Sequence, residues 1–316
     1  MLSQYSDEAV AAVGVSNQIL SLVIVMFGFV STGTAILIAQ HVGAKEESSA
    51  GKVAVVSLGA NLLFGFVLSI VLFSSSSILM QMMNLPEDLF DTANVYVMIV
   101  GGFIFIQAII MTLGAILRSY GYTKDSMKVT VGMNLLNIIG NYLFIFGPFG
   151  FPVLGVTGVA IATTGSRLLA MIVLFVIVYK RVKGELPFSY LLKKPVRELK
   201  QLLKIGIPSA GEHLAYSTSQ MMITYFVVQM GTEALTTRVY TLNIIMFVFL
   251  FSVAIGQGTQ ILVGHYTGAG DKEKAYYRCM RSLKLAVIIS TLMAAMVYLN
   301  SSYIFPFSQL MSPLFR

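Results

Sequence analysis

The chain has 316 residues, of which 56% are hydrophobic and 11% are charged, and its mean hydropathy is +0.81. Soluble domains carry about 25% charged residues, so the composition indicates a polytopic membrane protein and argues against a soluble enzyme. A single cysteine, Cys279, excludes a framework of disulfides within the chain. The chain starts MLSQYSDE, which is polar and acidic, unlike the basic start of a signal peptide.

Eight apolar runs are long enough to cross a bilayer, which takes about 20 helical residues. We expect helices, because a bilayer offers no partner to an open sheet edge and no run alternates as barrel strands do. The expected fold class is therefore an all-α polytopic membrane protein with eight transmembrane helices. In chain order the runs cover residues 11–40, 53–78, 93–117, 129–146, 154–179, 203–229, 235–264 and 283–304.

The basic residues of the chain gather in alternate loops. Of the 21 Lys and Arg residues, 18 fall in four loops or within two residues of their ends, the loops after the first, third, fifth and seventh runs. The positive-inside rule places these loops in the cytoplasm, so the net charge of +7 reflects topology and not nucleic-acid binding. We expect a multi-pass protein of the plasma membrane.

A sequence repeat links the first run to the seventh. Residues 33–44, GTAILIAQHVGA, match residues 258–269, GTQILVGHYTGA, at six of twelve positions with a constant offset of 225. The offset pairs the first run with the seventh and the second with the eighth, so one repeat unit holds six helices. Six is an even number, so the two repeats are parallel, as in transporters built from two six-helix lobes.

The same offset predicts the division of the chain into lobes. Residues 4–10 match the end of the sixth run, so the counterpart of the rest of that run is expected before residue 1. We expect an N-lobe at residues 1–180 without its first helix and a cytoplasmic linker at residues 181–202. The first three helices of a C-lobe are expected at residues 203–316.

Several segments resemble the multidrug and toxic compound extrusion (MATE) family, in the order in which that family carries them. EAVAAVG and GTAILIAQHVGA resemble its second helix, and IGIPSAGE resembles the start of its seventh. RSYGYTK, NLLNIIGN and LGVTGVAIA resemble the region from its fourth to its sixth helix, and GTQILVGHYTGAGDKEKA its eighth helix and the following loop. The resemblance implies an antiporter in which Na⁺ or H⁺ enters while amphipathic, often cationic compounds leave. It implies two lobes that rock about a central cleft and no cofactor beyond the coupling ion.

Glu212 is the clearest acidic residue within the apolar runs. A carboxylate inside a membrane costs about 2.5–3.5 kcal/mol on insertion scales, so it is a functional candidate by default. It can take up a proton or Na⁺ and can also pair with a cationic compound. Both uses compete for one charge, which provides a basis for exchange.

Asn134, Asn137 and Asn141 are spaced three and four apart, so they share one helical face. The resemblance places Asn137 and Asn141 where family members show Asn and Asp in an N-lobe cation site, but Asn141 cannot ionise. Helix packing through these amides is the alternative. Arg167, near the middle of the fifth run, is expected to pair with Glu212 or to extend toward a membrane surface, and Gln18 is a weaker candidate for lining the cleft.

Other functions remain open at this stage. A lipid-linked oligosaccharide flippase of the same superfamily would need several cationic residues in the cleft, where only Arg167 is expected. An intramembrane enzyme would need a catalytic constellation that the runs lack, and His213 and His265 have no second ligand at metal spacing. An inactive truncated remnant is a further alternative. We expect a monomer whose partners are the bilayer and small amphipathic compounds.

Overall fold

The computed structural model describes residues 2–83, 85–182, 186–193 and 195–299. The chain divides into two compact units. The first consists of Met1–Val42 and Glu46–Ile207, and the second of Gly43–Lys45 and Pro208–Arg316. The described residues form helices joined by short turns, and no strand occurs among them.

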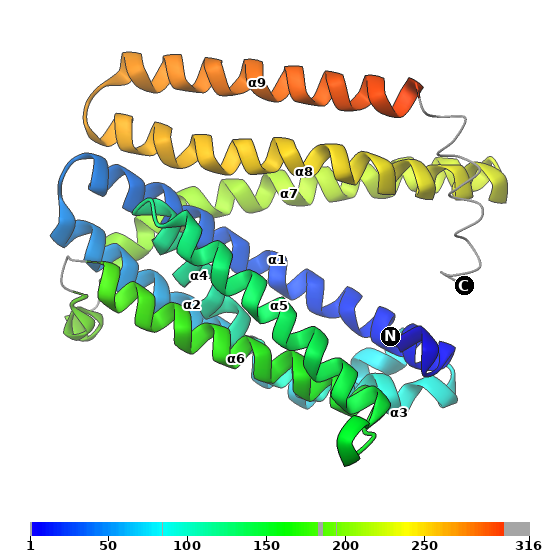
Figure 1. The fold of residues 1–316 in the computed structure, drawn as a ribbon. Helices are drawn as coiled ribbons and strands as arrows, with labels where there is room; N and C mark the ends of the chain where they lie inside the picture. Colours follow the sequence, from blue (N-terminus) through cyan, green and yellow to red (C-terminus); the bar gives the residue numbers. More distant parts are fainter. Residues whose placement is uncertain (1, 84, 183–185, 194, 300–316) are drawn as a thin grey trace. The chain divides into compact units, whose positions relative to one another are not determined.

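The first unit holds most of the helices, as Figure 1 shows in blue to green. Besides its α-helices it has three short 3₁₀ turns among the described residues, and one stretch is a π-helix, η2. The elements are η1 (Leu2–Gln4), α1 (Asp7–Gly43), α2 (Glu47–Met82), α3 (Glu87–Tyr96), η2 (Val97–Gly101), α4 (Phe105–Ser119), α5 (Thr123–Phe146), η3 (Pro148–Gly150), α6 (Gly155–Arg181) and η4 (Phe188–Lys193).

The second unit contains most of α7 (Val196–Gln229), together with α8 (Thr232–Gly268) and α9 (Lys272–Leu299). Arg238 of α8 donates a hydrogen bond to the side-chain oxygen of Gln220 in α7 over 2.9 Å. Ser252 and Ser290 join α8 to α9 through their hydroxyl groups, also over 2.9 Å. Side-chain hydrogen bonds therefore link all three helices of this unit.

Six of the described helices are long and apolar enough to cross a membrane: α1, α2, α5, α6, the part of α8 from Thr241 to Gly268, and α9. The bent pair of α3–η2 and α4 would be a seventh. Helix α7 is absent from this set because its middle, EHLAYSTSQ, is rich in polar residues. All eight predicted runs lie at least partly on helices, but the count of eight spans and the two six-helix repeats remain predictions.

The predicted run at residues 93–117 is not one straight helix. The segments Asp88–Gly101 and Phe105–Ser119 meet at an angle of 45°. Gly101 and Gly102 adjoin the break, and glycine lowers the stability of a helix there. The backbone N–H of Phe105 donates to Oγ of Ser69 over 3.1 Å, so a side chain of α2 satisfies an amide near the break.

A buried amide holds three helices of the first unit together. The side chain of Asn61 in α2 is completely buried, and its Nδ2 donates to Oγ1 of Thr112 in α4 over 2.7 Å. The same atom makes a longer contact of 3.4 Å with Oγ of Ser31 in α1. Polar bonds of this kind stabilise helix association in apolar surroundings.

The close approach of α2 and α4 depends on Gly65. A Cβ atom at this position would lie 2.9 Å from Cα of Phe105 and 3.1 Å from Cβ of Ala108. Since one of these neighbours is backbone, it cannot move aside by a change of rotamer. Small residues serve this purpose in membrane helix contacts, where packing replaces the hydrophobic effect as a driving force.

We predict that Gly65→Ala lowers the free energy of unfolding by about 1–3 kcal/mol, because it overpacks this contact. Gly132→Ala is the matched control: nothing lies within 4 Å of a Cβ there, so the better helix propensity of alanine should stabilise α5 by up to about 1 kcal/mol. Unfolding of both purified variants in detergent measures the difference. Equal effects of the two substitutions would contradict the role given to Gly65.

Candidate substrate and ion site

A chain of side-chain hydrogen bonds runs between α5 and α6. Nδ2 of Asn137 donates to Oγ1 of Thr163 over 3.1 Å. Nδ2 of Asn141, one turn further along α5, donates to Oδ1 of Asn137 over 3.2 Å. The two amides predicted to act together therefore contact each other, and one of them bonds the facing helix.

Tyr96 extends this chain toward α1. It is the last residue of α3, directly before the π-helix, and its side chain is buried. Its hydroxyl makes a long contact of 3.5 Å with Oδ1 of Asn17 in α1 and lies near the side chain of Thr163. Arg167, one turn after Thr163 on α6, also lies near Tyr96. We call Asn17, Tyr96, Asn137, Asn141, Thr163 and Arg167 the polar cluster.

Helices α5 and α6 run side by side in opposite directions (Figure 1), and three contacts define their register. Asn137 faces Thr163, a Cβ on Gly140 would lie 2.8 Å from Cβ of Ala162, and one on Gly158 would lie against Cβ of Phe144. In each facing pair the two residue numbers add up to 300 or 302. Because the helices are antiparallel, residues of α5 and α6 whose numbers have about this sum lie at the same height. By the same register, Asn134 lies level with Arg167.

The polar cluster therefore has two different ends. At one end Oδ1 of Asn141 is a buried acceptor, and it has no hydrogen-bond partner among the described residues. At the other end Arg167 supplies N–H donors, and the amide of Asn134 lies level with it. Asn134 and Asn141 are seven residues apart on α5, about 10 Å along the helix.

Arg167 lacks an acidic partner in the part of the chain that the structure describes. None of the salt bridges found in the described ranges includes it. The described residues also contain no group of His, Cys, Asp and Glu side chains that could hold a metal ion. The polar cluster thus consists of neutral groups and one positive charge.

The other candidate residues lie outside these contacts. Gln18 is exposed on α1, next to Asn17, and Asn134 is exposed on α5. Glu212 is exposed on α7 in the second unit, with no hydrogen bond or ion pair found for it among the described residues. Its pairing with Arg167, which belongs to the first unit, stays a prediction.

Sequence reasoning did not single out Tyr96, Thr163 and Asn17. Thr163 could have been found, because it precedes Arg167 by four residues and so shares its helical face. Tyr96 and Asn17 offered no such signal, since neither shares a helix with Thr163 or Arg167. The packing of α3 against α6 and the contact between Tyr96 and Asn17 bring them to the polar cluster.

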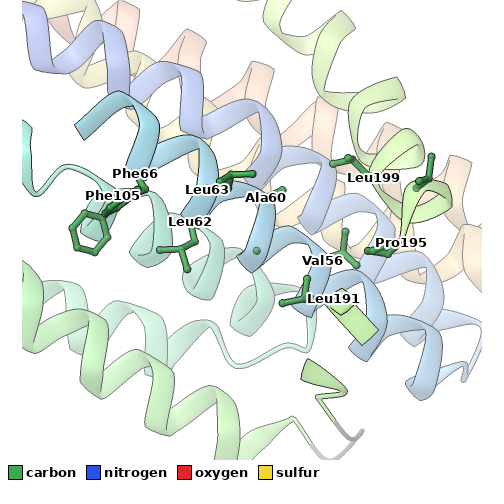
Figure 2. Close-up of a pocket in the computed structure, with 11 residues that line it drawn as sticks. Val56, Ala60, Leu62, Leu63, Phe66, Phe105, Leu191, Pro195 and Leu199 are labelled. Atoms are coloured by element: carbon green, nitrogen blue, oxygen red, sulfur yellow. The ribbon is translucent and has the colours of Figure 1, made fainter. Parts of the chain in front are cut away.

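A separate groove of about 800 Å³ lies between α2 and the chain segment around η4 (Figure 2). Its walls are entirely apolar: Val56, Gly59, Ala60, Leu62, Leu63, Phe66, Phe105, Leu191, Pro195, Val196 and Leu199. No side chain in it can hold an ion, so it is not part of the candidate site.

Polar contacts beside this groove fasten η4 to its neighbours. The hydroxyl of Tyr190 donates to Oε1 of Glu198 over 2.9 Å, and this hydrogen bond raises the pKa of Tyr190 above its ordinary value. Nζ of Lys52 in α2 lies 5.5 Å from the centre of the Tyr190 ring, a cation–π contact. The segment around η4 is therefore attached to α2.

A model of the MatE family matches residues 1–143 and 208–309, more than half of the chain. The chain belongs to the MatE family. Uncharacterized transporter YisQ of Bacillus subtilis is 54% identical over 290 residues, which cover 92% of this chain and 64% of that protein. The Thermotoga maritima protein named "Probable multidrug resistance protein NorM" is 30% identical over 272 residues, 86% of this chain and 58% of its own length. The chain thus spans less than two thirds of these relatives.

Solved structures of similar fold include MATE in complex with MaD5, with a TM-score of 0.87 and 23% identity. That match covers 99% of this chain and 71% of the other. MATE in the straight conformation matches with a TM-score of 0.85 and 23% identity, over 98% of this chain and 69% of the other. The predicted membership of the MATE family is confirmed. With its apolar helices, the chain is a multi-pass membrane protein from a family of transporters, which is consistent with the expectation that it is not an enzyme.

We predict that Asn137→Ala lowers the free energy of unfolding by about 1 kcal/mol, since it breaks the bond between α5 and α6 and leaves Asn141 without an acceptor. Asn134→Ala removes an exposed amide of the same helix and should change stability by less than about 0.5 kcal/mol. Denaturant titration in detergent measures both. A loss no larger for Asn137→Ala than for Asn134→Ala would show that the hydrogen-bonded chain contributes nothing to packing.

Proposed function

We propose that the protein exports amphipathic organic compounds, many of them cationic, in exchange for Na⁺ or H⁺ by alternating access. The observation that carries the proposal is the family match together with the relatives named as multidrug resistance proteins. The proposed orientation has the four basic loops in the cytoplasm and the helices in the plasma membrane, as the positive-inside rule requires. The bilayer and the exported compounds are the partners that this function needs.

The proposed exchange depends on a carboxylate that two cations cannot occupy at once. Glu212 on α7 is the acidic residue best placed for it along the sequence, four residues after Pro208. When a coupling ion or a proton neutralises the carboxylate, its attraction for an organic cation is lost. When the organic cation binds, the coupling ion must leave. Exchange then follows from electrostatics alone, and each compound exported is matched by a cation taken up.

We predict that Glu212→Gln abolishes coupled exchange. Proteoliposomes with the purified chain would be loaded with protons or Na⁺, and ethidium, an amphipathic cation, would be added outside. The wild type should release the coupling ion when ethidium is added, as reported by a pH-sensitive dye or by ²²Na⁺. The variant should be slower by at least about tenfold, a barrier increase of about 1.4 kcal/mol.

Glu273→Gln is the control, because it removes an exposed carboxylate from the first turn of α9. It should exchange at the rate of the wild type. Full-rate exchange by Glu212→Gln would remove this residue from the mechanism. No ethidium-dependent ion release from the wild type in either gradient would contradict the antiport itself.

A further inference from the structure

Arg167 lies too deep in α6 to reach water easily. It is 12 residues from Gly155 and 14 from Arg181, the two ends of the helix, or about 18 and 21 Å along its axis. Arginine near the end of a membrane helix can extend to the interface, but from this depth the side chain cannot span the distance. The side chain is half-buried, so its charge is only partly exposed.

Such a charge needs a compensating group. A lone cation at the centre of a bilayer is costly and is usually paired. Across the described residues Arg167 has no carboxylate partner, and the groups of the polar cluster around it, such as Tyr96 and Thr163, are neutral. A guanidinium group has five N–H donors, and no hydrogen bond from Arg167 is found among the described residues.

Asn134 adds a neutral donor at the same level. The register of α5 against α6 places it opposite Arg167, on the helical face that also carries Asn137. Its side chain is exposed, and no hydrogen bond is found for it in the described part of the chain. A guanidinium and an amide N–H at the same level can donate to the oxygens of a carboxylate or sulfonate, and arginine binds these groups with two parallel hydrogen bonds.

We propose that Arg167 and Asn134 form an anion-binding subsite that takes the acidic group of an amphipathic compound. The inference rests on the proposed export function and extends its substrate class from cations to amphipathic acids. The remaining members of the polar cluster orient the subsite: Thr163 and Tyr96 fix the face of α6 that presents Arg167. The same positive charge repels free cations, so the coupling ion is bound elsewhere, in agreement with the role proposed for Glu212.

The test is equilibrium binding of one probe in two charge states. The purified full chain, in an uncharged detergent, would be titrated at pH 8 with 11-(dansylamino)undecanoic acid and with its methyl ester, which differ only in the acidic group. Dansyl fluorescence reports binding. We expect the wild type to bind the acid at least about tenfold more tightly than the ester.

Substitutions test which residues cause the preference for the acid over the ester. Arg167→Gln should bind the acid no more tightly than the ester, with the affinity for the ester unchanged. Arg167→Lys keeps the charge without the two parallel donors, so it should retain part of the preference, and Asn134→Ala should reduce it. Arg181→Gln is the control: this arginine is exposed at the end of α6 and bonds Asp125 over 3.0 Å, and its loss should leave the preference intact.

Equal binding of acid and ester by the wild type would overturn the proposal, as would an undiminished preference in Arg167→Gln. If Arg167→Gln does not fold, Arg167→Lys and Asn134→Ala are compared with the wild type instead. An undiminished preference for the acid in both of these variants would also overturn the proposal. If phosphatidylglycerol displaces the probe, the subsite binds a lipid headgroup. If phosphatidylglycerol does not displace the probe, the subsite binds soluble amphipathic acids. The assay uses no ion gradient, so its result is independent of whether the chain carries out antiport.

Discussion

Polar groups inside an apolar helix bundle must bond one another, and the first unit is arranged around that constraint. Water is not available within a bilayer, so an unpaired amide or hydroxyl is costly. Asn61 meets Thr112, and Ser69 meets the backbone amide of Phe105 where α4 begins. The same requirement builds the polar cluster, in which Asn137 bonds Thr163. Packing and the candidate site therefore use one kind of contact.

The two sites differ in burial and in charge. Asn61 is enclosed by α1, α2 and α4, where it stabilises helix contacts, whereas Arg167 is half-buried and has only neutral neighbours. An enclosed amide can be replaced at a modest cost in stability. A charge without a counter-ion needs an external group, and this makes Arg167 the basis of the proposed anion subsite. Glu212, on α7, offers the opposite charge in the second unit.

Much of the fold was predictable because bilayer crossing requires long apolar helices. The runs at residues 11–40 and 129–146 lie within α1 and α5, and the family was identified from motifs that the comparison confirms. The bend after the π-helix was not predicted, although Gly101 and Gly102 lie in the run at residues 93–117 where the helix breaks. The face shared by Asn137 and Asn141 was predictable from helical periodicity. The hydrogen bond from Asn137 to Thr163 was not.

By itself, the sequence determined the class of protein, the approximate extent of its helices, its family and the spacing of the asparagines on α5. These follow from composition and periodicity, which are local properties of the chain. The tertiary structure decided which polar residues meet: Tyr96 with Asn17 and Thr163, and Asn134 level with Arg167. Those contacts depend on the register between helices, and register is set by close packing at small residues such as Gly140 and Gly158. No single helix contains that information.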